Sequence, residues 1–243
     1  MKSPTPALVL LAHGTRDAAG AAEIERLAGL VGDRVVVAYA DVRPPTLADV
    51  LAHISGPAVV VPAFLAAGYH VRVDVPAQLV ATGRSDVSLA ASLGPDPILA
   101  EVAVQRLVAA GWRPGDTVVL GAAGSTDPQA IADVQRAAAM VGDRVGQPVE
   151  VGFATGTPKI AELVTAHRAA DLPGTSQVAV ASWLLAPGMF QRTLVSSGAN
   201  VVADPLGAHP RVAELIRARY AAACTTAGGE SPGRYMCAAD EVG

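Results

Sequence analysis

The sequence contains few of the residues that mark nucleic-acid-binding or membrane proteins. Aromatic residues make up 4% of the 243 residues, which argues against base stacking on single-stranded nucleic acid. The formal net charge is −4 and no basic block is present, which also argues against a nucleic-acid partner. No run reaches the ~20 apolar residues that a membrane helix needs. The first apolar run is short and ends at His13, so it does not resemble a signal peptide. We therefore expect a cytoplasmic protein with no nucleic-acid or membrane partner.

Cysteine is also scarce. The only two, Cys224 and Cys237, lie near the C-terminus, and a lone pair of thiols forms no structural zinc pattern. Free thiols in a cytosolic protein are the simpler interpretation. A role shared across a dimer stays open.

The abundant residues are aliphatic: hydrophobic residues make up 51% of the chain and charged residues 16%, as expected of a well-buried globular protein. Short β-branched runs alternate with Ala-rich stretches that have helical spacing. The strands are uniformly apolar, as in parallel sheets covered on both faces. We predict strands at 7–12, 34–39, 58–63, 87–91, 117–122, 148–153, 177–182 and 200–203. We predict helices at 19–31, 46–54, 75–82, 97–110, 128–140, 158–169, 188–197 and 210–222, several of them beginning at a proline.

The second half of the chain repeats the first. The matching segments are "LLAHGTRD" (10–17) with "LGAAGSTD" (120–127), "VVVPAFLAAGYHVR" (59–72) with "AVASWLLAPGMFQR" (179–192), and "LGPDPILAEVAVQRL" (93–107) with "LGAHPRVAELIRARY" (206–220). The fold class is therefore α/β, with two tandem βα-repeat domains whose parallel sheets are flanked by helices. We place the domains at 1–114 and 115–224, and expect a disordered tail at 225–243.

Three polar residues of the first repeat are missing from the second. His13 aligns with Ala123, His70 aligns with Phe190, and the segment equivalent to Asp41 has no carboxylate. Either histidine alone would suit a packing role. Their joint loss from the second copy instead predicts a single, asymmetric site in the N-terminal half.

These residues follow three successive strands, so they map to the carboxyl edge of one parallel sheet, where ligands bind in open α/β folds. With the common strand order 2-1-3-4, His13 and His70 flank the point where the order reverses. Two imidazoles and a carboxylate suit iron, cobalt, nickel or zinc. The long spacing between them follows no local motif rule, so the residues alone leave metal handling open.

The stretches "LLAHGTRD", "AYADVRPPTL" and "VPAFLAAGYHVRVDVP" resemble the class II sirohydrochlorin chelatases, the two-domain group of sirohydrochlorin cobaltochelatases and siroheme ferrochelatases. The resemblance covers about residues 7–222. It implies insertion of Fe²⁺ or Co²⁺, as substrate, into sirohydrochlorin without a nucleotide, in a cleft between the two halves. Of the two ions, we prefer iron.

The same resemblance implies roles for the three polar residues. The family's two metal-binding and catalytic histidines correspond to His13 and His70. A family glutamate falls at Asp41, which the resemblance places with the metal-binding and catalytic residues. Its side chain is one methylene shorter, so it reaches the metal either directly or through a water molecule.

Sirohydrochlorin is rich in carboxylates, which arginine binds in a bidentate manner. We expect Arg16, Arg43, Arg72 and Arg192 to bind them. Arg72 and Arg192 occupy matching positions, and we expect both on loops that face each other across the cleft. A duplicated chain supplies both halves of such a cleft, so a monomer is sufficient.

Two other functions stay open. A non-catalytic carrier of metal or tetrapyrrole would use the same cleft. A histidine phosphatase would use His13 as phosphoryl acceptor and Arg16 for phosphate, although its motif has an arginine where this chain has Ala12.

Overall fold

The computed structural model describes residues 5–170 and 177–227, without the side chains of residues 70, 226 and 227. Most of the predicted tail, from residue 228 on, lies outside the described residues. Its predicted beginning is wrong, because the last helix continues to Ala227. Among the described helices, none has the length and apolarity needed to cross a bilayer.

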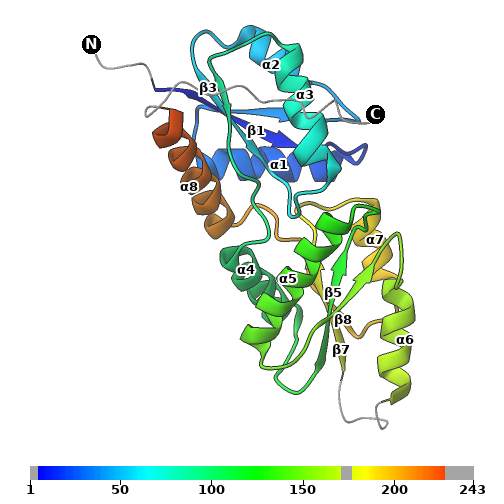
Figure 1. Ribbon diagram of the computed structural model, residues 1–243. Helices are drawn as coiled ribbons and strands as arrows, with labels where there is room; N and C mark the ends of the chain where they lie inside the picture. The colour runs from blue at the N-terminus through cyan, green and yellow to red at the C-terminus, as the bar shows by residue number, and fades with distance from the viewer. Residues whose placement is uncertain (1–4, 171–176, 228–243) are drawn as a thin grey trace, which may run out of the picture.

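The chain forms two lobes, each built on a four-stranded parallel sheet (Figure 1). The predicted order 2-1-3-4 is confirmed in the first sheet and recurs in the second, as β2-β1-β3-β4 and β6-β5-β7-β8. The strands are β1 (Ala7–Ala12), β2 (Val35–Tyr39), β3 (Ala58–Pro62), β4 (Val87–Leu89), β5 (Thr117–Ala122), β6 (Glu150–Phe153), β7 (Val178–Trp183) and β8 (Val201–Val202). The helices are α1 (Ala18–Val31), α2 (Leu47–His53), α3 (Val75–Ala81), α4 (Pro97–Ala110), α5 (Pro128–Val145), α6 (Ile160–Ala170), α7 (Met189–Val195) and α8 (Pro210–Ala227).

The apolar strands are buried on both faces, as their composition predicts. In β1, Leu8 and Leu10 belong to one hydrophobic cluster, whereas Val9 and Leu11 belong to another on the opposite face. This alternation follows from the two-residue period of a strand. Each face is then covered by helices.

The helices begin where sequence signals place them, with one exception. Asp17 accepts a hydrogen bond from the Ala19 amide at the start of α1, and Asp127 accepts one from the Gln129 amide at the start of α5. Pro128 is the first residue of its helix, as predicted. The prediction that α6 begins at Pro158 is wrong, because the helix begins at Ile160.

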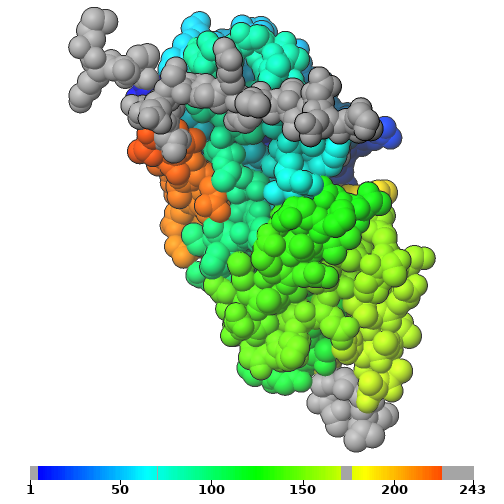
Figure 2. Space-filling view, in the orientation of Figure 1, coloured from blue at the N-terminus to red at the C-terminus, as the bar shows by residue number. Residues whose placement is uncertain are grey.

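The last helix of each repeat packs on the sheet of the other repeat. Helix α4 contacts α5, β7 and β8, whereas α8 returns to contact α1, β3 and β4; Figure 1 shows α8 beside the first lobe and α4 beside the second. One hydrophobic cluster therefore includes residues of both sheets and both exchanged helices. The space-filling view shows the two lobes in contact along their seam (Figure 2). The boundary predicted at residues 114 and 115 follows the sequence repeat, whereas the packing assigns α4 to the second lobe.

Candidate functional site

The ends of β1 and β2 are tied together at the carboxyl edge of the first sheet. The Asp41 amide donates a hydrogen bond to the His13 carbonyl (2.9 Å). Gly14 follows with φ +105°, and a Cβ at this position would lie 2.0 Å from the Asp41 carbonyl oxygen. Only glycine fits such a close approach. The backbone thus brings His13 and Asp41 together, as the strand order predicts.

The loop after β3 also lies at the carboxyl edge of the first sheet, close to His13. The exposed His13 ring lies 6.1 Å from the Phe64 ring, at an interplanar angle of 59°. Phe64 opens the loop that leads to the π-helical turn η1 (His70–Asp74), and His70 is the first residue of that turn. The side chain of His70 lies outside the described residues. Within the described part of the chain, no group of three or more His, Cys, Asp or Glu side chains is placed to hold a metal ion. The metal-binding roles of His13, His70 and Asp41 stay predictions.

Val42 has a strained backbone at this edge. Its φ is +73°, in the left-handed region that β-branched residues rarely adopt, and its amide donates to the Asp41 carboxylate (2.6 Å). The side chain is nevertheless 44% exposed. Thr155 is the equivalent of Asp41 in the second repeat, because its amide donates to the Ala123 carbonyl as the Asp41 amide donates to the His13 carbonyl. The residue after Thr155, equivalent to Val42, is Gly156. Val42 is not among the residues predicted for the site, although the change from valine to glycine between the repeats signals it.

Arg16 and Arg43, two of the arginines predicted to bind carboxylates, have different surroundings. Arg16 is exposed on the loop between β1 and α1. Arg43 stacks over the Tyr39 ring, with its guanidinium carbon 5.0 Å from the ring centre. Its Nε is buried without a hydrogen-bond partner among the described residues. Burial raises the pKa of the Tyr39 hydroxyl, and Glu25 raises that pKa further.

Arg72 and Arg192 are not on loops, so that prediction is wrong. Arg72 lies in η1 and donates to the Asp127 carboxylate (2.7 Å), while Arg192 lies in α7 and donates to the Asp17 carboxylate (2.5 Å). Both arginine side chains are exposed to solvent. Each ion pair connects a residue of one lobe with a residue of the other. The hydrogen bonds from these arginines hold the pKa values of Asp127 and Asp17 below their ordinary range. The two ion pairs occupy equivalent positions in the repeats.

A hollow of about 370 Å³ lies between the lobes at one of these ion pairs. Its lining comes from the first lobe through Asp17 and Ala19 and from the second lobe through residues 187, 188, 191, 192, 195 and 196. A smaller hollow of about 260 Å³ lies wholly in the second lobe, between α5 and β6. Neither is lined by His13 or Asp41.

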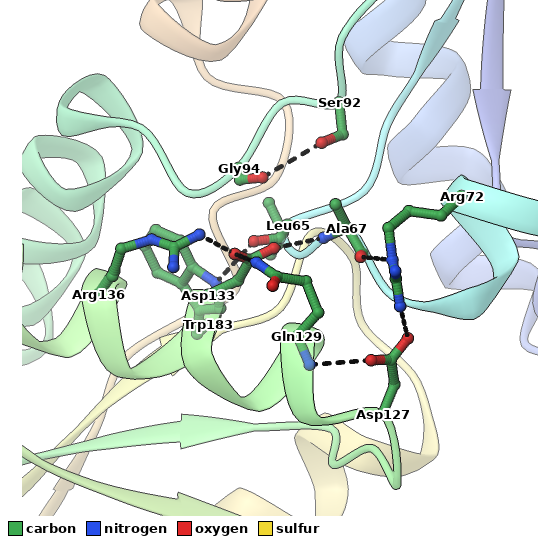
Figure 3. A network of polar contacts seen from close by, with 10 residues as sticks. All are labelled: Leu65, Ala67, Arg72, Ser92, Gly94, Asp127, Gln129, Asp133, Arg136 and Trp183. Carbon is green, nitrogen blue, oxygen red and sulfur yellow. Dashed lines mark hydrogen bonds and ion pairs between the residues drawn. The ribbon is translucent and has the colours of Figure 1, made fainter.

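A polar network joins the loop after β3 to the second lobe (Figure 3). The Ala67 amide donates to Asp133 of α5 (2.7 Å), and the Trp183 indole N–H donates to the Leu65 carbonyl (3.4 Å). Arg72 donates both to the Ala67 carbonyl (3.1 Å) and to Asp127. The loop that precedes His70 is thus held by residues of the other lobe, which the sequence analysis did not foresee.

Duplicated parallel sheets, with His13 and His70 following strands of the first copy and no histidine at the equivalent positions of the second, define a two-lobed α/β protein with an asymmetric candidate site. The chain belongs to the CbiX family, whose model matches residues 7–110 and 117–223. The two matched segments are the two sequence repeats. No curated protein matches the chain.

Solved structures share this fold over nearly their whole length. SirB from Bacillus subtilis with Fe³⁺ has a TM-score of 0.76 and 21% identity, covering 94% of this chain and 99% of that one. The sirohydrochlorin chelatase SirB from Bacillus subtilis subspecies spizizenii, in complex with cobalt, has a TM-score of 0.73 and 18% identity, covering 94% and 99%. CbiX, described as the terminal enzyme of siroheme biosynthesis in denitrifying bacteria, has a TM-score of 0.65 and 23% identity, covering 89% and 98%.

Proposed function

We propose that this protein is a sirohydrochlorin chelatase, which inserts Fe²⁺ or Co²⁺ into sirohydrochlorin and uses no nucleotide. The observation that carries the proposal is the CbiX family match over both repeats, combined with the asymmetric placement of His13 and Asp41 at one sheet edge. The SirB structures that share the fold hold Fe³⁺ and cobalt. We further propose that the protein acts in the cytoplasm and that a monomer is sufficient.

Metal insertion requires an ion that is held and then released. Neutral imidazoles bind iron and cobalt without the permanence of thiolates, which suits His13 and His70 as ligands. Asp41 adds a carboxylate on the neighbouring strand end. The Asp41 amide is hydrogen-bonded to the His13 carbonyl, and this bond fixes the position from which the shorter Asp41 side chain extends.

Formation of the product releases two pyrrole protons for each divalent ion bound. A histidine is the side chain best suited to accept a proton near neutral pH, so His13 or His70, once the ion has left it for the macrocycle, accepts the pyrrole protons in turn and passes them to water. The exposed Val42, which follows Asp41 in the chain, supplies an apolar surface on which the flat macrocycle lies.

The substrate carboxylates need cationic partners. Arg16 is exposed on the β1–α1 loop, and Arg43 lies on the β2 loop. Arg72 and Arg192 already pair with Asp127 and Asp17, so they bind substrate carboxylates only by sharing or exchanging those partners.

An anaerobic absorbance assay tests the proposal. Sirohydrochlorin and Fe²⁺ or Co²⁺ are mixed with and without the protein, and the conversion to the metallated spectrum is followed. We expect conversion to be faster with the protein for at least one ion, and the faster ion indicates the pathway, siroheme for iron or cobalamin for cobalt. Tight metal binding with no acceleration for either ion would instead indicate a carrier.

A further inference from the structure

The loop that leads to His70 is fastened to a buried carboxylate of the other lobe. Asp133 is only 1% exposed, and it lies on α5 facing the loop (Figure 3). Its Oδ2 accepts the Ala67 amide (2.7 Å), and its Oδ1 accepts the Gln129 side chain (3.2 Å) and pairs with Arg136. A buried carboxylate is costly unless it is paired and hydrogen-bonded, and charge-assisted bonds of this kind are strong.

The loop also lies directly against α5. A Cβ added at Gly68 would be 3.3 Å from the Ala130 methyl group, so the loop backbone approaches the helix closely. Together with the Ala67–Asp133 bond, this contact fixes the backbone just before η1. The position of His70 relative to His13 therefore depends on the second lobe.

The equivalent carboxylate of the first repeat makes no such contact. Glu23 aligns with Asp133, is also buried, and pairs with Arg26 as Asp133 pairs with Arg136. However, Pro187 replaces Ala67 in the second repeat and has no amide hydrogen to donate. Glu23 accepts a hydrogen bond from the Ala208 amide instead. Of the two equivalent loops, after β3 and after β7, only the one that leads to His70 is therefore anchored in this way.

We infer that Asp133 is a positioning residue for His70, holding the metal-binding loop of the first lobe through the Ala67 amide. This inference rests on the proposed function, in which His70 binds the ion. The inference gives the second repeat a role in the site, although the second repeat has no equivalents of His13 and His70. Residues that orient metal ligands without touching the metal change metal affinity by about 10–100-fold when they are replaced.

The test measures Co²⁺ binding by its visible absorbance, without sirohydrochlorin, in the full chain. Asp133→Ala removes the acceptor and Ala67→Pro removes the donor, so each breaks the same bond from one side. Asp133→Asn keeps an oxygen that accepts the amide. Glu23→Ala is the matched control, because it removes an equivalent buried carboxylate from the other helix. Hydrogen exchange of residues 64–72 reports on the loop itself, and circular dichroism reports on folding.

We expect Asp133→Ala and Ala67→Pro to raise the Kd for Co²⁺ about tenfold, to alter the absorption bands and to speed exchange of residues 64–72. Asp133→Asn restores most of the affinity, and Glu23→Ala binds Co²⁺ like the wild type. Wild-type affinity and bands in a folded Ala67→Pro or Asp133→Ala variant would overturn the inference. A Co²⁺ spectrum unchanged by His70→Ala would instead refute the proposed metal site, while the exchange data would still show whether the anchor exists.

Discussion

Val42 shows how much the site depends on single residues. A β-branched residue in the left-handed region costs about 1–3 kcal/mol and persists only where the surroundings enforce it. Here the enforcing contacts are local, because the Val42 amide is bound by the Asp41 carboxylate and the Arg43 amide donates to the Asp41 carbonyl. The second repeat has Gly156 at this position, with φ +112°. The strain is therefore confined to the copy that carries the histidines.

Replacing Val42 with glycine should separate stability from activity. Val42→Gly relieves the left-handed strain but adds chain entropy to the unfolded state, so we expect a net gain of about 1 kcal/mol in the free energy of unfolding. The rate of metal insertion falls, because the exposed apolar surface is lost. Urea unfolding and the absorbance assay measure the two effects. Val36→Gly is the control: Val36 lies exposed in β2, and its loss should lower stability. A less stable Val42→Gly variant would show that the backbone there is not strained.

At the scale of elements, the two lobes are joined by equivalent ion pairs. Arg72 of η1 forms an ion pair with Asp127, which immediately precedes α5. Arg192 of α7 forms an ion pair with Asp17, which immediately precedes α1. Each aspartate also caps its helix, so one carboxylate serves both the helix start and the contact between lobes. The positive end of the helix dipole favours the same negative charge.

The Arg72–Asp127 pair should make stability depend on acid pH. The hydrogen bond from Arg72 is the main cause that lowers the Asp127 pKa in the folded state, followed by the Gln129 amide. The stabilisation is thus complete above the ordinary aspartate pKa and is lost as the pH falls through the lowered value. A double-mutant cycle of Arg72→Ala and Asp127→Asn, measured by urea unfolding from about pH 6 to about pH 3, should show a favourable coupling that fades toward acid. A coupling that is constant over this range would contradict the assignment.

The sequence predicts the helices and strands and the order of strands in the first sheet, but it does not predict which sheet α4 and α8 cover. Uniformly apolar strands can lie only in a sheet covered on both faces, and Asp or Pro residues mark most helix starts. In contrast, α4 and α8 begin within similar segments, "LGPDPILAEVAVQRL" and "LGAHPRVAELIRARY", so by sequence either helix suits either sheet. The roles of Arg72, Arg192 and Asp133 were likewise hidden, because their partners lie in the other repeat.

At the scale of the whole molecule, the exchange of α4 and α8 links the lobes into one folding unit. The buried residues Leu215 and Ile216 of α8 and Leu99 of α4 belong to the same cluster as the strands of both sheets. Covering each sheet with a helix from the other repeat means that neither repeat has a complete core of its own.

The isolated first repeat should therefore not fold stably. A fragment of residues 1–114 keeps its sheet but loses α8, which contacts β3 and β4, and it exposes the apolar face of α4. We expect the full chain to unfold in one cooperative thermal transition and the monomeric fragment to show none, by circular dichroism. A monomeric fragment with a cooperative transition would contradict the exchange of helices.

The most direct test of the account compares one substitution at the carboxyl edge of each repeat's sheet in the metal-insertion assay. His13→Ala removes a proposed ligand from the first repeat. Thr155→Ala alters the second-repeat residue that takes the place of Asp41. We predict that His13→Ala lowers the rate of Fe²⁺ or Co²⁺ insertion by at least about 100-fold, whereas Thr155→Ala retains nearly the wild-type rate. A folded His13→Ala variant with the wild-type rate, or an equal loss in Thr155→Ala, would contradict a single site on the first lobe.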